Sequence, residues 1–221
     1  MPYRKGAKSD FSAITRNCMC RAKSGNQLTH FDKLAGSHVH VSHCIWKSPG
    51  GSIVSIHPLA ASEWRVYRDL RLQALIDSPD AFASRYEDEA ARDDSAWATR
   101  VSAVASSASA QVLIAFQQTE PCGLVWCKSL DADPLVVELF QMWVAPSSRG
   151  TGAGRALLDA AIAWAVTRDA ERVCLGVTLA DSPAMHLYQS SGFRPVGEPE
   201  PLRPGSALTS QPMELHLKRP G

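Results

Sequence analysis

Residues 142–155, M-W-V-A-P-S-S-R-G-T-G-A-G-R, decide the fold of this chain of 221 residues. An apolar run leads into a Pro/Ser turn, a glycine-rich loop and an Ala/Leu-rich segment, which predicts a strand, a loop and a helix. Gly150, Gly152 and Gly154 remove side chains where the loop turns, so that main-chain N–H groups can face one concave spot. The first amides of the helix, and the positive end of its dipole, point the same way. The loop is therefore predicted to bind an anion, and a pyrophosphate suits it.

The opening of the chain differs in composition from the rest. Residues 1–50 carry eight basic and two acidic residues, although the whole chain has a net charge of +1. They also hold four of the seven histidines and three of the six cysteines, and they show no sustained apolar period. We therefore predict a basic, poorly ordered extension over residues 1–52 and one folded domain over residues 53–221.

Two functional interpretations of the extension are disfavoured. Cys18-x-Cys20 and Cys44, with His38, His40 and His43, offer zinc ligands, but zinc modules usually open with C-x2-4-C, so we predict no metal site. A basic arm that binds nucleic acid is also disfavoured, because the charges are scattered and no aromatic residues lie between them.

The location of the protein follows from its apolar segments and cysteines. No apolar run reaches the roughly 18 residues of a membrane span, and the basic start lacks the apolar core of a signal peptide. Cys122, Cys127 and Cys174 lie in apolar, strand-like surroundings and are predicted to be buried free thiols. We therefore expect a soluble, cytoplasmic protein without membrane contact. The sequence does not decide between a monomer and a homodimer.

Hydrophobic periodicity predicts an alternation of strands and helices downstream of residue 52. Ser62 is the predicted cap of the first helix, and the strand over 173–177 is apolar enough to be covered on both faces. The predicted order is a strand (52–59), two helices (62–77 and from about 93), three strands (111–116, 122–130, 135–144), a helix after the glycine loop, a strand (173–177), a short helix from 181, and two strands (193–196 and 212–218).

Three nucleotide-binding patterns compete for the glycine loop. A Rossmann loop requires G-x-G-x-x-G near the start of a βαβ unit, whereas the spacing here is G-x-G-x-G. A Walker loop requires Lys followed by Ser or Thr, and this loop ends in Gly154-Arg155-Ala156. The third pattern, Arg149-x-x-Gly152-x-Gly154 after a Val-Ala-Pro strand end, resembles motif A of the GNAT acyl-CoA-dependent N-acetyltransferases.

A second motif supports this resemblance. Residues 181–193, D-S-P-A-M-H-L-Y-Q-S-S-G-F, are similar to the family's motif B, N-x-x-A-x-x-L-Y-x-x-x-G-F, with Asp181 in place of the usual asparagine. The resemblance covers roughly residues 53–217. It implies an α/β GNAT fold: a mixed, mostly antiparallel central sheet of about six to seven strands, four main helices on its faces, and splayed strands at the acetyl-CoA site.

The resemblance also implies a set of cofactor-binding residues. The strand before the loop would splay from its neighbour and leave main-chain groups of Met142 and Val144 free for the pantetheine arm, and the amide of Met142 or a close neighbour would steady the oxyanion. Asp181 would contribute a polar contact, although an ionised carboxylate donates no hydrogen bond. The pyrophosphate would lie on amides from this set: Arg149, Gly150, Thr151, Gly152, Ala153, Gly154 and Arg155.

Four side chains are candidates for proton transfer. Tyr188 matches the family's general acid, and the alternative is a core tyrosine on an amphipathic helix. Glu138 resembles the base glutamate of histone-type members and is expected to share a strand face with Phe140 and Met142. The alternative is that Glu138 is a solvated carboxylate without a catalytic role and that water acts as the base. His57 and His186 are weaker candidates and are expected to be structural.

The resemblance predicts transfer of an acetyl group from acetyl-CoA to a primary amine of a small molecule or a protein by direct attack. Two alternatives stay open: a CoA-binding sensor or interaction module with weak or no turnover, and a protein that binds another nucleotide. The sequence does not name the acceptor. The acidic run Glu87-Asp88-Glu89 is compatible with a cationic acceptor and equally with a solvated loop.

Overall fold

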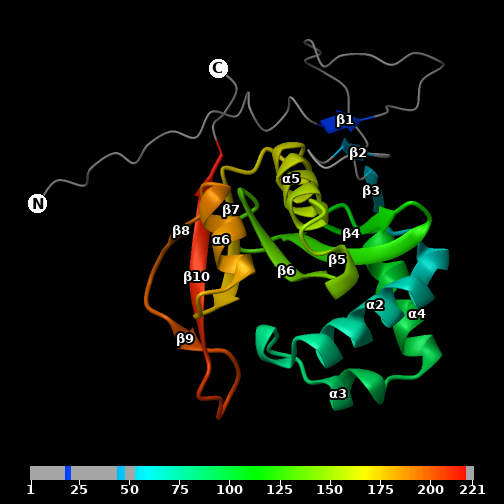
Figure 1. Cartoon of the computed structure of the whole chain (residues 1–221), viewed down its shortest axis with the longest axis horizontal. Coiled ribbons are helices and arrows are strands. Elements are labelled where there is room, and N and C mark those ends of the chain that lie inside the picture. The colour runs from blue at the N-terminus through cyan, green and yellow to red at the C-terminus, as the bar shows by residue number, and fades with distance from the viewer. Residues whose placement is uncertain (1–17, 21–43, 48–52, 218–221) are drawn as a thin grey trace, which may run out of the picture.

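The computed structural model describes residues 18–20, 44–47 and 53–217 (Figure 1). They form one sheet with the strand order β1-β2-β3-β4-β5-β6-β7-β10-β8, to which β9 adds by pairing with β10. Among the described strands, β6 and β7 are parallel and the other pairs are antiparallel. The strands are β1 (Cys18–Cys20), β2 (Cys44–Lys47), β3 (Ile53–Pro58), β4 (Ala110–Gln117), β5 (Glu120–Ser129), β6 (Val136–Val144), β7 (Arg172–Thr178), β8 (Arg194–Pro195), β9 (Glu200–Pro201) and β10 (Thr209–His216).

Helices lie on both faces of the sheet, as Figure 1 shows, with α5 on one side and α2, α3 and α4 on the other. The helices are η2 (Ala61–Glu63), α2 (Trp64–Asp77), η3 (Pro79–Ala81), α3 (Tyr86–Ala90), α4 (Asp94–Ala105), η4 (Pro146–Ser148), α5 (Ala153–Val166) and α6 (Pro183–Ser190). No helix in the described ranges is long and apolar enough to cross a lipid bilayer.

Each face of the sheet has its own apolar core. The first core joins α5 and α6 to one face and includes Leu157, Trp164 and Phe193. The second joins α2 and α4 to the opposite face and includes Tyr67, Trp97 and Trp143. Side chains alternate between the two faces of a strand, which is why β4 and β5 supply both cores. The layered α/β architecture with four main helices, α2, α4, α5 and α6, confirms the predicted fold class.

Most predicted elements are present, with local differences. Asp93 caps α4, and its side chain accepts a hydrogen bond from the amide of Ala96 at 2.7 Å. Ser62 does not cap the first helix, because it lies inside the 3-10 turn η2 that precedes α2. β8 lies within the predicted strand over 193–196, β10 begins and ends earlier than the predicted strand over 212–218, and β9 and the short helix α3 were not predicted.

The prediction that β7 is covered on both faces is wrong. Val173, Leu175 and Val177 are buried, but Cys174 is only partly buried and Gly176 is exposed. Arg172 starts the open face and pairs with Asp133 and Glu214 at 2.8 and 3.2 Å. Because Cys174 and Gly176 are small and not charged, the sequence of β7 suggested burial on both faces. In the structure, helices cover the face with Val173, Leu175 and Val177, and the other face is open.

Part of the segment 1–52 is described. Strand β2 pairs with β3 in antiparallel register, from Cys44 beside Ile56 to Lys47 beside Ile53, and β1 pairs with β2. The half-buried Trp46 packs against the core on the α5 side. The three histidines of the disfavoured zinc set lie outside the described residues.

Candidate functional site

The glycine loop joins the end of β6 to the start of α5 in a tight turn. Gly150 and Gly152 have φ angles of 77° and 92°, in the left-handed region that other residues rarely adopt. Gly152 is the N-cap of α5. Gly154 lies inside the first turn, where a Cβ would make ordinary contacts with Leu187 of α6 and Val144 of β6. The ends of β6, α5 and α6 therefore meet at this loop.

The loop exposes a row of main-chain donors. The amides of Arg149 and Thr151 already donate to the carbonyls of Pro146 and Ser148 at 3.3 and 3.4 Å. The amides of Gly150 and of Gly152 to Arg155 donate to no acceptor among the described residues. Together with the positive end of the α5 dipole, these amides are an arrangement that can bind an anion.

β6 and β7 separate beside this loop. Their parallel pairing runs from Val136 beside Arg172 to Leu139 beside Leu175 and stops there, although both strands continue. The amide of Ala145 donates to the carbonyl of Cys122 on the β5 side, at 2.8 Å. Because alternate residues of a strand direct their main-chain groups to opposite sides, those of Val144 and Met142 face the gap towards β7. The expected splay of the strands is thus present.

A β-bulge at Gln141 changes which side chains share a face of β6. Gln141 has a φ of 55°, and the β5–β6 register shifts beside it. Tyr67 of α2 donates to the side-chain oxygen of Gln141 at 2.8 Å. The predicted shared face of Glu138, Phe140 and Met142 is therefore wrong. The extra residue turns Met142 towards the α5 side, while Phe140 lies opposite Trp126 on the α2 side.

The Asp77 carboxylate at the end of α2 ties the loop to the opposite layer. It accepts hydrogen bonds from the hydroxyl of Ser78 at 2.6 Å and from Trp143 Nε1 at 2.9 Å, and it pairs with Arg149. Arg149 Nε also donates to the carbonyl of Val144 at 3.0 Å. Hydrogen bonds from Ser78, Trp143 and Arg149 lower the pKa of Asp77. The Arg149 side chain is thus committed to protein contacts, and so is that of Arg155, which pairs with Asp159 at 3.0 Å.

Tyr188 is buried beside the splayed strands. It belongs to the same core as Ala153, Leu175 and Val177, and its ring centroid lies 5.8 Å from that of Phe193. Its hydroxyl bonds to no other described group, and burial raises its pKa. The phenol therefore stays protonated at neutral pH.

Glu138 lies further back along β6, opposite Lys128 of β5 and beside Cys174 of β7. Burial raises the pKa of this half-buried carboxyl group, and the charge of Lys128 opposes the rise. Such a carboxylate is a stronger base than a solvated one.

The remaining candidates lie after β7, in α6 and in β3. Asp181 pairs with His186 at 3.0 Å, and both side chains are largely exposed. The ring of His57 lies 5.0 Å from that of Phe116. His57 belongs to β3, which three strands separate from β7 in the sheet. The acidic run is not a solvated loop, because Glu89 lies in α3, is buried and pairs with Arg92 at 3.0 Å.

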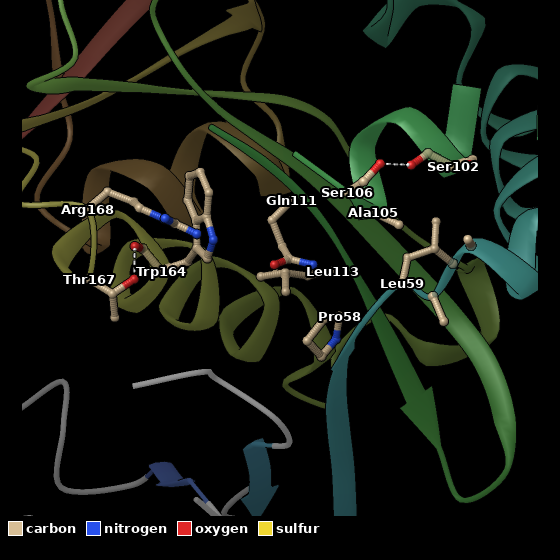
Figure 2. Close-up of a pocket in the computed structure, with 12 residues that line it drawn as sticks. Pro58, Leu59, Ser102, Ala105, Ser106, Gln111, Leu113, Trp164, Thr167 and Arg168 are labelled. Atoms are coloured by element: carbon tan, nitrogen blue, oxygen red, sulfur yellow. Dashed lines mark hydrogen bonds between the residues drawn. The ribbon is translucent and has the colours of Figure 1, made fainter. Parts of the chain in front are cut away.

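Two hollows lie outside the gap. One, of about 500 Å³, lies between α4, the end of α5 and the strands β3 and β4, where Figure 2 shows Trp164, Gln111 and Leu59 around it. It contains none of the predicted site residues. The other, of about 480 Å³, lies between the end of α2, α3 and Arg203. No group of three metal-ligating side chains is found in the part of the chain that the structure describes.

Several residues that shape the gap gave no signal in the sequence. Asp77 reads as the last residue of a helix, Tyr67 as a core position, and Gln141 as an ordinary strand residue, although a positive φ is uncommon for glutamine. Their partners lie 66 to 74 residues away in the chain, so local patterns could not have found them.

Comparison with known proteins agrees with this geometry. Mycothiol acetyltransferase of Thermobispora bispora is 32% identical over 124 residues, 56% of this chain and 40% of that protein. N-alpha-acetyltransferase 40 of Saccharomyces cerevisiae is 37% identical over 98 residues, 40% of this chain and 34% of that protein. The chain thus spans less than half the length of these relatives.

Solved structures share the fold. A GNAT-family acetyltransferase of Streptococcus pneumoniae superposes with a TM-score of 0.62 at 22% identity, over 74% of this chain and 99% of that one. The Salmonella typhimurium protein yncA, solved with its cofactor acetyl-CoA, gives a TM-score of 0.60 at 19% identity, over 76% and 96%. The model of the acetyltransferase (GNAT) family matches residues 66–193, more than half of the chain. The chain belongs to the acetyltransferase (GNAT) family.

Proposed function

We propose that the protein is an acetyl-CoA-dependent N-acetyltransferase. The observation that carries this proposal is the gap between β6 and β7, which opens beside the row of free amides at the start of α5. The pyrophosphate would accept hydrogen bonds from the amides of Gly150 and of Gly152 to Arg155. Each bond to a charged acceptor is worth about 1.5–3 kcal/mol. The pantetheine arm would lie along the main chain of Met142 and Val144.

The transfer step needs an oxyanion donor, a base and an acid. As the amine attacks the thioester carbon, the C–N bond forms, and a main-chain amide at the bulge, that of Met142 or a close neighbour, would stabilise the oxyanion. Glu138, or a water molecule that it polarises, would take the proton from the amine. The C–S bond then breaks and the sulfur takes a proton from Tyr188. Because burial raises the pKa of Tyr188, that proton moves only as negative charge develops on the sulfur.

Asp181 has the weakest support among the cofactor candidates. Its exposed carboxylate pairs with His186, and an ionised carboxylate repels phosphate rather than donating to it. We also propose a cytoplasmic location, because the buried free thiols of Cys122 and Cys127 suit a reducing compartment.

Acetyl transfer is tested by release of free CoA thiol with a panel of primary amines, together with mass spectrometry of the products. We expect at least one amine to gain about 42 Da in step with thiol release, because one acetyl group replaces one hydrogen. Tight CoA binding without acetylation of any amine would instead favour the sensor alternative, and no CoA binding at all would contradict both.

A further inference from the structure

Arg71 of α2 is buried without a hydrogen-bond partner. Its residue exposure is 1%, and Nε and Nη1 are enclosed without an acceptor. No described carboxylate forms an ion pair with it. Fully buried arginines are almost always paired, because an unpaired buried charge loses its hydration without compensation. The guanidinium therefore lacks an anionic partner.

The groups around Arg71 do not supply one. The ring of Phe82 lies over the guanidinium, 4.6 Å from its carbon, which offers a cation–π contact and no hydrogen bond. Burial lowers the pKa of Arg71, while Tyr67 and Glu89 act in the opposite direction. Glu89 is already bound by Arg92 and Arg100, at 3.0 and 3.7 Å.

The nearby charged groups leave the Arg71 guanidinium without an ion pair. Glu89 is the buried carboxylate whose charge acts on Arg71, but its ion pairs are with Arg92 and Arg100. The hollow of about 480 Å³ at the end of α2 is lined by Arg85, Arg203 and Glu87, and Arg203 pairs with Asp80 at 3.9 Å. The unpaired guanidinium of Arg71 favours an anionic guest over the cationic one that the acidic run of α3 suggested.

Arg71 lies between two residues of α2 that hydrogen-bond to side chains of β6. Tyr67, one turn earlier, bonds to the bulge residue Gln141, and Asp77, about 9 Å further along the helix axis, bonds to Trp143. The connection between α2 and α3 covers the guanidinium through Phe82. Thr178 and Arg203 donate to main-chain carbonyls of this connection at 2.7 to 3.2 Å.

We propose that Arg71 binds a carboxylate carried by the acceptor, so that the acceptor is a small amine with a carboxylate group, such as a free amino acid. This inference rests on the proposed acetyltransferase function. A guanidinium binds a carboxylate through two parallel N–H donors, which fixes both the distance and the orientation of the acceptor amine. Because Nε and Nη1 are enclosed, the carboxylate reaches Arg71 when the ring of Phe82 and its connection move outward.

Matched acceptors test the proposal. For each L-amino acid and its carboxamide, kcat/KM is measured with acetyl-CoA for the wild type, Arg71→Met and Arg71→Lys. We expect the wild type to prefer the carboxylate about tenfold or more. Arg71→Met should lose this preference but keep its activity on the carboxamide, and Arg71→Lys should recover part of it. Arg65→Met is the control, because Arg65 belongs to the same helix and also lies over an aromatic ring, that of Trp64, but is exposed. A wild type without preference, or Arg71→Met with an unchanged preference, would overturn the proposal.

A binding measurement covers the case in which no acceptor is acetylated. The melting temperature of the full chain, with and without CoA, is recorded with the same amino acids and carboxamides. We expect carboxylates to raise it in the wild type and in Arg65→Met but not in Arg71→Met, whose own melting temperature is equal or higher because an unpaired buried charge is removed. Equal shifts for carboxylates and carboxamides would overturn the role of Arg71 whatever the fate of the proposed function. A loss of folding in Arg71→Met would also contradict it, because it would show that the guanidinium is needed for packing alone.

Discussion

Single side chains define the proposed chemistry, and Tyr188 is the clearest to test. Phenylalanine keeps the buried ring against Phe193 and removes only a hydroxyl that bonds to no described group. We expect Tyr188→Phe to lower kcat about 10²- to 10⁴-fold while CoA affinity and melting temperature stay nearly constant. The defect should shrink with an acyl donor whose leaving thiol is more acidic. Normal turnover with acetyl-CoA would show that Tyr188 is a core tyrosine.

Asp77 is a second residue with a measurable signature. Its folded-state pKa is below the usual 3.8, so its contribution to stability is fully present above that value and is lost as the pH falls through the folded pKa. We expect Asp77→Asn to melt at a lower temperature than the wild type near pH 7, and the difference to shrink below about pH 3.8. Asp69→Asn, which removes an exposed carboxylate of the same helix, serves as the control and should change little. A difference that does not depend on pH would rule out the ionised carboxylate as its cause.

At the scale of elements, the loop between β6 and α5 can be tested by glycine substitution. Gly152→Val forces a β-branched residue into a φ of 92° and places its side chain beside the free amides. We expect the Kd for CoA to rise about tenfold or more, since the loss of one charge-assisted hydrogen bond costs about that much.

Gly205→Val is the matched control for backbone strain. Gly205 has a φ of 74° and open space around it, in the loop between β9 and β10. The Gly205→Val substitution should lower the melting temperature without weakening CoA binding. Equal effects of the two substitutions on the Kd would remove the loop from the binding site.

The sequence predicts these elements unequally, for physical reasons. The loop and the cap of α6 were predictable because glycine at positive φ, serine at an N-cap and Pro183 in the first turn act locally. The bulge at Gln141 was not, because its geometry depends on the hydroxyl of Tyr67, which reaches it from another layer. For the same reason, the pattern of β6 misplaced Met142, whose face changes with one extra residue.

At the scale of the whole molecule, the extension and the domain can be separated by truncation. Removing residues 1–43 leaves β2 in place, whereas removing residues 1–52 also deletes the strand beside β3 and the packing of Trp46. We expect both truncated proteins to bind CoA like the full chain, because the gap lies three strands away from β3. The shorter protein should melt at a lower temperature, by about 2–4 °C for each kcal/mol lost. Loss of CoA binding in either protein would contradict the division at residue 52.

Acetyl-CoA bound as we propose would lie in the gap between β6 and β7, with its pyrophosphate on the start of α5, and amide-resolved hydrogen exchange measures this directly. With saturating acetyl-CoA, we expect slower exchange at Met142, Val144, Gly150 and Gly152 to Arg155, because these amides gain acceptors and lose contact with water. The amides of Leu59 and Leu113, which line the hollow beside α4 and the end of α5, should be unchanged. Saturable binding that leaves the exchange of residues 142–155 unaltered, or protection confined to that hollow, would contradict the account.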